Sequence, residues 1–323
     1  MSRQKGFVKT ILVNLFAISM ILTLGGANSA AEKFPSREII IVVYQAAGGS
    51  LDLVSRILAE YLKKELGVPI VVENRPEGGG IKGIMDVYRA KPDGYLLMPN
   101  IMPRNAQLET VYKAPFKIMD FTYLDAFQTQ EGVVIVSKNS PCNNLQELIE
   151  TSKRKSLNCS ISGIGTISHL DAMLLKKKVG VNLEVVPFKG AAPAMMALLG
   201  GNVDLATMDA FSALLQKDKI RALAIFAERS SKKFSGVPTI KELGYDVPFG
   251  YTVTGICGPS EMPEDIRRIL SDALVKVFKN PDFISKLEQM GPTHVYMSGP
   301  EFRRLSESFY KLVEEYKDVF MEK

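Results

Sequence analysis

The sequence of 323 residues has no tryptophan, two histidines (His169 and His294) and three cysteines. It has no Cys-x-x-Cys pair, which argues against a structural zinc site. The glycine fingerprints of dinucleotide-binding and Walker loops are missing, and so is the G-x-S-x-G turn of many hydrolases. Paired catalytic carboxylates and a cofactor box are also missing. We therefore expect no metal, no cofactor and no enzymatic activity.

One long apolar run lies at the N-terminus, and it predicts export. Arg3, Lys5 and Lys9 precede an uncharged run, and small residues follow it, as in a secretory signal peptide. We expect residues 1–31 to be cleaved after Ala31 and the mature chain to be periplasmic. The alternative is an uncleaved anchor, but the run is short for a bilayer span of about 20 residues.

Charge excludes another class of function. Loss of those three N-terminal cations would lower the formal net charge of +5 to +2. No basic stripe with interleaved aromatic residues is present, so no nucleic-acid partner is expected.

The cysteines leave two alternatives open. Cys142 and Cys159 flank one predicted helix and could pair after export, since the compartment is oxidising. Buried, unpaired thiols are an equal alternative.

Alternating periodicities predict an α/β fold. Residues 37–100 are typical of strand–helix–strand–helix–strand, and residues 132–227 repeat the alternation. No low-complexity tether separates the halves, so we expect strands near residues 126–136 and 246–256 to cross between two lobes. Each lobe is predicted to be a mainly parallel sheet flanked by helices, with a ligand cleft between the lobes. The predicted boundaries are 34–133 plus 253–303 for lobe 1 and 134–252 plus 304–323 for lobe 2.

Three turns between a strand and a helix are candidate anion sites, because ligands of parallel sheets bind beyond the carboxyl ends of the strands. The first contains Gly48 and Gly49, whose following N–H groups open a helix with a positive end. Asp52 could cap that helix, contact a cationic group of the ligand or order a water.

The second turn, residues 162–170, offers hydroxyls and N–H groups that suit a carboxylate. Thr166, Ser168 and His169 are its candidate residues. Ser168 beside His169 raises a nucleophilic interpretation, but adjacent helical residues point about 100° apart and form no ready dyad. His169 could equally bond to backbone.

The third turn and one strand end complete the set of candidates. Lys189 could meet an anion or remain solvated, and Gly190 follows a strand. Asp209 ends a further strand that should face the cleft.

The segments "VVENRPEGGG", "KPDGYLLM", "SGIGTISHL" and "VPFKGAAPAMMALLGGNVD" occur in an order that resembles the Bug-type receptors. These are the periplasmic solute-binding proteins of tripartite tricarboxylate transporters. The resemblance covers essentially the whole mature chain. It implies a two-lobed fold of the periplasmic-binding-protein type (type II) that closes on a small carboxylate.

The resemblance also implies which residues bind the ligand. In the first turn they are Ala47, Gly48, Gly49 and Asp52; in the second they are Thr166, Ser168 and His169. The sequence departs from the family where a Pro-aromatic pair usually precedes the first turn. Tyr44 and Gln45 stand there, and Tyr44 adds a polar group beside the predicted pocket.

We therefore predict a receptor, expected to be monomeric, that captures a small organic acid and delivers it to transporter membrane subunits. Two alternatives are a sensor role and an exported hydrolase using Ser168 and His169. In a third, the ligand is an amino acid whose ammonium binds Asp52.

Overall fold

Strands and helices alternate along the chain, as the periodicities predicted. The computed structural model describes residues 33–164, 166–227, 232–247 and 251–318. The predicted signal peptide, residues 1–31, lies outside them. The description below concerns residues from 37 onward, which form one unit by their contacts.

The strands are β1 (Ile39–Val43), β2 (Ile70–Asn74), β3 (Leu96–Met102), β4 (Thr122–Gln130), β5 (Gly132–Ser137), β6 (Leu157–Ile161), β7 (Leu183–Pro187), β8 (Leu205–Asp209), β9 (Ile220–Phe226), β10 (Thr252–Gly258) and β11 (Thr293–Met297). The α-helices are α2 (Ser50–Leu66), α3 (Ile81–Tyr88), α4 (Arg104–Thr110), α5 (Leu145–Arg154), α6 (Ile167–Leu174), α7 (Ala191–Leu199), α8 (Ala210–Leu214), α9 (Glu264–Phe278), α10 (Pro281–Gln289) and α11 (Gly299–Glu315). Shorter helical segments are η1 (Glu77–Gly80), η2 (Ile118–Asp120), η3 (Leu175–Val179) and η4 (Lys232–Phe234).

The strands form two sheets, one in each lobe. The first has the order β11-β4-β10-β3-β1-β2 and the second the order β7-β6-β8-β5-β9. Strands β1, β2 and β3 are parallel, as are β6, β7 and β8, whereas β10 and β5 run antiparallel to their neighbours. The two-lobed α/β fold is confirmed, and each sheet is mixed because the strands near the crossings reverse direction.

Helix α2 shows how the sequence sets these elements. Apolar residues at helical spacing put Leu51, Val54, Leu58 and Leu62 on its buried face. The helix ends at Gly67, which has φ 73° and donates its N–H to the carbonyl of Lys63. Glycine adopts this left-handed conformation without the steric cost that a Cβ would bring.

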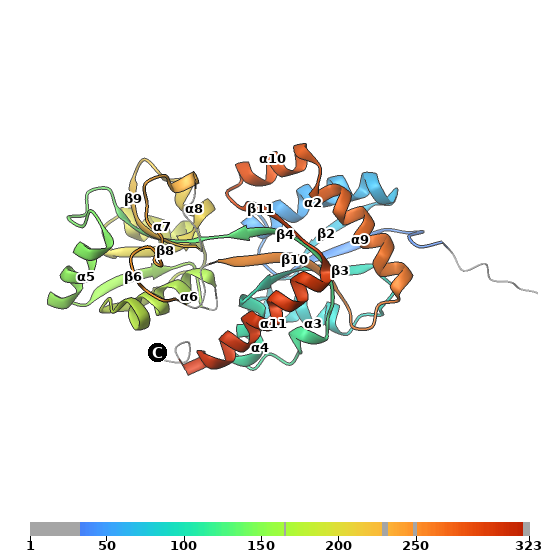
Figure 1. Ribbon diagram of the computed structural model, residues 1–323, viewed down its shortest axis with the longest axis horizontal. Coiled ribbons are helices and arrows are strands. Elements are labelled where there is room, and N and C mark those ends of the chain that lie inside the picture. Colours follow the sequence, from blue (N-terminus) through green and yellow to red (C-terminus); the bar gives the residue numbers. More distant parts are fainter. Residues whose placement is uncertain (1–32, 165, 228–231, 248–250, 319–323) are drawn as a thin grey trace, which may run out of the picture. The chain divides into compact units, whose positions relative to one another are not determined.

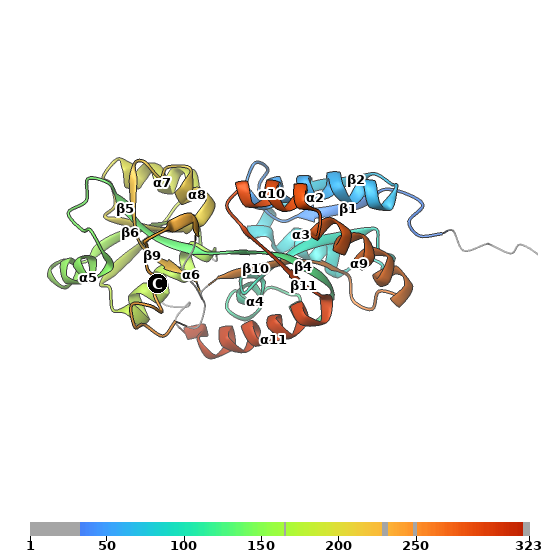
Figure 2. The ribbon, with the colours of Figure 1, turned by 45° about the horizontal axis from the view of Figure 1, so that its top comes forward.

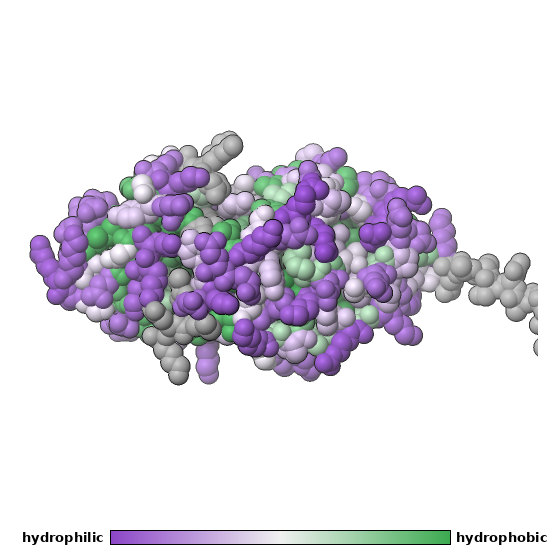
Figure 3. Space-filling view, turned by 60° about the horizontal axis from the view of Figure 1, so that its bottom comes forward, coloured by the Kyte–Doolittle hydropathy of each residue, from purple (hydrophilic) through white to green (hydrophobic). Residues whose placement is uncertain are grey.

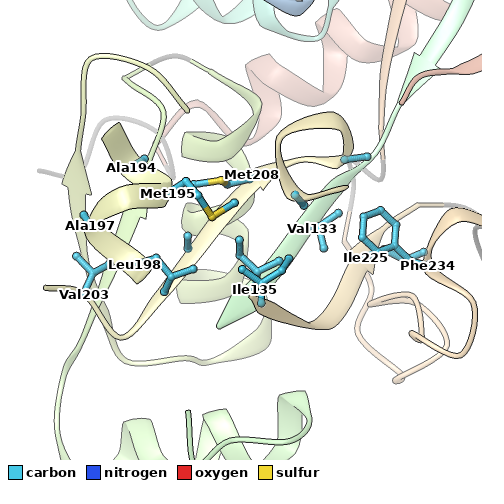
Figure 4. Close-up of a cluster of buried hydrophobic side chains, with 14 of the residues drawn as sticks. Val133, Ile135, Ala194, Met195, Ala197, Leu198, Val203, Met208, Ile225 and Phe234 are labelled. Carbon is cyan, nitrogen blue, oxygen red and sulfur yellow. The ribbon is translucent and has the colours of Figure 1, made fainter. Parts of the chain in front are cut away.

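The second lobe has an apolar core between its sheet and helix α7. Val133 and Ile135 from β5 and Met208 from β8 are completely buried, and Met195 of α7 lies against them (Figure 4). The sequence predicts that Met195 and Met196 are both core; Met195 is 5% exposed, but the prediction is wrong for Met196, which is 67% exposed. This packing fixes the sheet below the second and third turns.

The chain crosses between the lobes where β4 continues into β5, and β10 runs beside β4 (Figure 1). Only a residue without a side chain fits at Gly132, because a Cβ there would overlap Oδ2 of Asp171 and lie 2.6 Å from its Cγ. Asp171 is 2% exposed, its Oδ2 has no hydrogen-bond partner among the described residues, and burial raises its pKa well above the ordinary value. A buried carboxyl group from α6 therefore packs on the crossing.

The C-terminal helix α11 contacts α4 and β4 of the first lobe, and both views show it beside α4 (Figure 2). Phe302 and Val313 of this helix are fully buried. Residues 304–323 were predicted to belong to lobe 2, and through Glu315 their helix instead packs on lobe 1. The rest of the lobe division stays a prediction.

The pairing of Cys142 with Cys159 is not present, and all three cysteines are free and buried. Their sulfur atoms face different neighbours: Cys142 lies 3.5 Å from the hydroxyl of Thr151, and Cys159 lies 3.9 Å from that of Thr207. Burial raises the pKa of the Cys159 thiol to about 12, so it behaves as an unreactive core residue.

Hydrophilic residues cover most of the face seen in Figure 3, with smaller apolar patches between them. In the described parts of the chain, every helix is too short or too polar to cross a bilayer.

We predict that Gly132→Ala destabilises the protein by about 1–3 kcal/mol, since the added methyl overpacks the crossing. Asp171→Ala should make room for it, so the double variant should lose less stability than the sum of the two single variants. Urea unfolding of all four proteins measures this coupling. Simple additivity would show that the two residues do not oppose each other.

Candidate functional site

The first predicted turn follows β1 and leads into α2. Gly48 has φ 81° and open space where a Cβ would stand, and Gly49 is the N-cap of α2 in extended conformation. No side chain caps the helix. Ala47, Gly48 and Gly49 are exposed. The Gly48 and Gly49 N–H groups bond within the turn, to Asp52 and the Ala46 carbonyl, so the donors that could meet an anion are those of the first turn of the 17-residue helix.

Asp52 holds this turn from inside. Its carboxylate accepts hydrogen bonds from the Gly48 N–H at 2.8 Å and from the Asn74 side chain at 2.9 Å, and Arg56 pairs with it at 2.9 Å. Asn74 also donates to the carbonyl of Gln45. Burial alone would raise the pKa of Asp52, but the bonds from Arg56, Gly48 and Asn74 bring that pKa below its usual value. Asp52 is 2% exposed, and protein groups occupy both of its oxygens.

The second predicted turn is a cluster of mutually bonded hydroxyls. Ser168 is fully buried, and its Oγ lies 2.7 Å from Ser162 Oγ and 2.8 Å from Thr166 Oγ1. Thr166 is the N-cap of α6: its hydroxyl donates to the Gly163 carbonyl and accepts from the His169 N–H. The cluster thus orders the start of α6.

His169 joins the second lobe to the first. Its Nδ1 lies 3.4 Å from the hydroxyl of Tyr112, which follows α4. Burial lowers the pKa of His169 from its ordinary value, so its ring is neutral at neutral pH.

Tyr44 and Arg104 were brought together by the fold without any sequence signal. Tyr44 follows β1 and is 1% exposed, and its hydroxyl accepts from the Ile101 N–H and the Asn105 side chain. The Arg104 guanidinium carbon lies 5.0 Å from the centre of the Tyr44 ring. Tyr44 therefore supports an arginine, although its hydroxyl was expected beside the pocket. Arg104 is the first residue of α4, a helix that the sequence analysis missed.

The third turn lies beside the second because β6 and β7 are parallel neighbours. The Phe188 N–H donates to the Ile161 carbonyl, linking the two turns. Gly190 is the N-cap of α7 with φ 123°, and Lys189 is exposed.

Asp209 is a helix cap whose oxygens are occupied. It accepts from the backbone and hydroxyl of Ser212 at the start of α8 and from the Gln130 side chain of β4. Asp209 therefore ties α8 to the crossing.

Two sets of contacts lie on the two sides of the candidate site. In the first lobe Arg104 lies over the Tyr44 ring. Between the lobes Tyr112 contacts His169, whose N–H bonds to Thr166. A separate hollow lined by Glu60, Lys63, Lys64 and Gly67 includes none of these residues.

Two mixed sheets flanked by helices are joined by crossing strands, and strand–helix turns lie between them. This is the architecture of solute-binding proteins. Comparison with known proteins is more specific: residues 54–313 match the model of the tripartite tricarboxylate transporter family receptor. The chain belongs to this receptor family.

A curated relative and two solved structures illustrate the likeness. The chain is 31% identical to the "UPF0065 protein in gbd 5'region" of Cupriavidus necator, over 87% of this chain and 86% of that one. The periplasmic binding protein BugD is 28% identical, with a TM-score of 0.79 over 90% of this chain and all of BugD. MatC from Rhodopseudomonas palustris with bound malate is 26% identical, with a TM-score of 0.75 over 89% of this chain and all of MatC.

We predict that Asp52→Asn lowers the free energy of unfolding at pH 7 by about 1–2 kcal/mol, since it weakens charge-assisted bonds. The lowered pKa means that the carboxylate's stabilisation is present above its unfolded pKa of about 4 and is lost as the pH falls through the folded pKa. The gap between variant and wild type should therefore close in acid. Urea unfolding from pH 3 to 7 measures it.

The matched control is Asp93→Asn, which breaks the exposed pair of Asp93 with Arg37 and should cost under about 1 kcal/mol. Equal losses in the two variants would contradict a structural role for Asp52 in the turn.

Proposed function

We propose that the protein is a periplasmic receptor that captures one small organic acid between its lobes and delivers it to the membrane subunits of a tripartite tricarboxylate-type transporter. Family membership supports the receptor class, and MatC, a relative of similar fold, was solved with malate. The family model matches residues 54–313, and the match with MatC covers 89% of this chain and all of MatC, which supports extending the receptor class to this chain.

The observation that carries the proposal is the contact between Tyr112 and His169. Tyr112 follows α4 of the first lobe and His169 belongs to the first turn of α6, so this contact supports a site shared by the two lobes. Helix N-termini and hydroxyls from both lobes can then bind one carboxylate, which needs several donors at once.

Closure would follow from this arrangement. An acid that bonds to donors of both lobes has more contacts when the lobes are close, so it favours the closed state. The passage at residues 130–132, beside the start of β10 at Thr252, would act as the hinge. The membrane subunits would then recognise the closed form.

The hydrolase alternative has little support. Ser168 Oγ bonds with Ser162 and Thr166, and Ser168 is fully buried. A nucleophile needs its oxygen beside a general base and open to the substrate. No observation favours the sensor role.

The amino-acid alternative also loses support, because Arg56, Asn74 and Gly48 already occupy the Asp52 carboxylate. A ligand ammonium would have to displace one of them.

We predict that a thermal-shift screen of di- and tricarboxylates, aromatic acids and amino acids will find a stabilising acid. Saturation at about 100 times the dissociation constant adds about 2.7 kcal/mol, a readily detected shift. No shift with any acid, for protein shown to be folded by circular dichroism, would refute the proposed ligand class.

We further predict that Thr166→Val weakens binding of that acid about tenfold, because it removes the hydroxyl that orders the start of α6. Thr151→Val is the control: Thr151 bonds to the Glu147 carbonyl within α5 of the same lobe, and its loss should leave affinity as in wild type. Calorimetric titration of both variants compares them. An unchanged affinity in Thr166→Val would exclude the second turn from the site.

A further inference from the structure

Arg104 is a partly buried cation without an acid partner in the described part of the chain. Burial lowers the pKa of Arg104, and Tyr44 and Tyr112 raise it; no carboxylate contributes. By contrast, Arg37 lies 3.6 Å from the centre of the Tyr95 ring and pairs with Asp93, and Arg75 pairs with Glu73 and Asp86. Arg104 has the aromatic support without the counter-ion.

This arrangement is energetically costly unless something compensates for it. Burial lowers the pKa of Arg104, but an arginine stays protonated in proteins. A desolvated charge is normally paired, because removal from water without a partner costs several kcal/mol. The Tyr44 ring returns only part of that cost.

The guanidinium also has unused donors. One terminal nitrogen donates to the Asn105 side chain at 3.2 Å and the other to the Gly79 carbonyl at 3.0 Å. Its Nε is buried and has no hydrogen-bond partner among the described residues. An arginine has five N–H donors, so these two bonds leave part of the fork for a planar anion.

The surrounding residues fix the guanidinium in place. The Tyr44 hydroxyl is held by the Asn105 side chain and the Ile101 N–H, and Asn105 also donates to Asn100. A Cβ at Gly80 would overlap the Tyr44 carbonyl and lie 3.1 Å from its ring. The glycine-rich segment η1 and the end of β1 therefore fit closely below Arg104.

We propose that Arg104, held by Tyr44, is the specificity-determining residue that binds a second anionic group of the ligand, so that the receptor selects a dicarboxylate over a monoacid of equal size. This rests on the proposed function, in which the turns bind the first carboxylate. The second carboxylate would receive parallel hydrogen bonds from the fork, as arginine–carboxylate pairs do. Lys189, the other cation among the candidates, is exposed and so has no comparable need for a partner.

The test compares each diacid of a series from succinate to adipate with its half-amide, which has nearly the same shape and one negative charge fewer. Calorimetric titration gives the ratio of the two dissociation constants. Wild type should prefer the diacid by about 30-fold or more, as expected for a desolvated charge pair. In Arg104→Gln the ratio should fall close to one.

Two further variants keep the test interpretable. Arg104→Lys retains the charge without the fork and should keep part of the ratio, even if Arg104→Gln folds poorly. Arg37→Gln removes another arginine that lies over a tyrosine ring and should keep the wild-type ratio.

The outcomes separate the two proposals. A ratio that survives in Arg104→Gln, or that falls equally in Arg37→Gln, overturns the role of Arg104. Equal binding of diacid and half-amide by wild type also overturns it but leaves the carboxylate receptor intact. Folded wild-type protein that binds no acid refutes the receptor proposal itself, and the role of Arg104 with it.

Discussion

The structure depends on the short passage from β4 to β5, where residues 130–132 carry the chain from one sheet to the other. Gln130 pairs with Thr252 of β10, so both strands at the crossing are held together. The Gln130 side chain bonds to Asp209, and the Glu131 carbonyl accepts from the Ala210 N–H. The start of α8 is thereby attached to the crossing.

Two kinds of polar group lie around the candidate site, and their difference is informative. Asp52, Asp209 and the hydroxyls of Ser168 and Thr166 have protein partners within the site, so their first role is to shape turns. Arg104 lacks an acid partner among the described residues. Polar groups that the protein already satisfies set geometry, whereas a desolvated charge left without a partner points to a ligand.

The architecture could be predicted from the sequence because most of its strands and helices follow from local residue patterns. Strand and helix periodicities and the turn at Gly48 and Gly49 depend on neighbours in the chain. The same patterns failed for α4 and for β11, which is mostly half-buried and short. Their stability comes from packing against α11 and β4, which no local pattern records.

The missed residue shows the limit most clearly. Arg104 and Tyr44 are 60 positions apart, and nothing near either one predicts that the ring will lie under the guanidinium. The departure at Tyr44 was visible, but its reason was not. A phenol hydroxyl at this position looked like a ligand contact, whereas its bonds to Ile101 and Asn105 turn it inward.

Tyr44, where the sequence differs from the family pattern, therefore positions Arg104 and is less suited to contact the ligand itself. A tyrosine supplies both a ring that attracts a cation and a hydroxyl that fixes the ring. The hydroxyl is anchored to the same helix that begins with Arg104, through Asn105. Ring, helix and guanidinium are thus positioned as one unit, and a change at Tyr44 would move the charge without touching the turns. In the proposed site, ligand preference would therefore vary at the Arg104 end while the two turns stay the same.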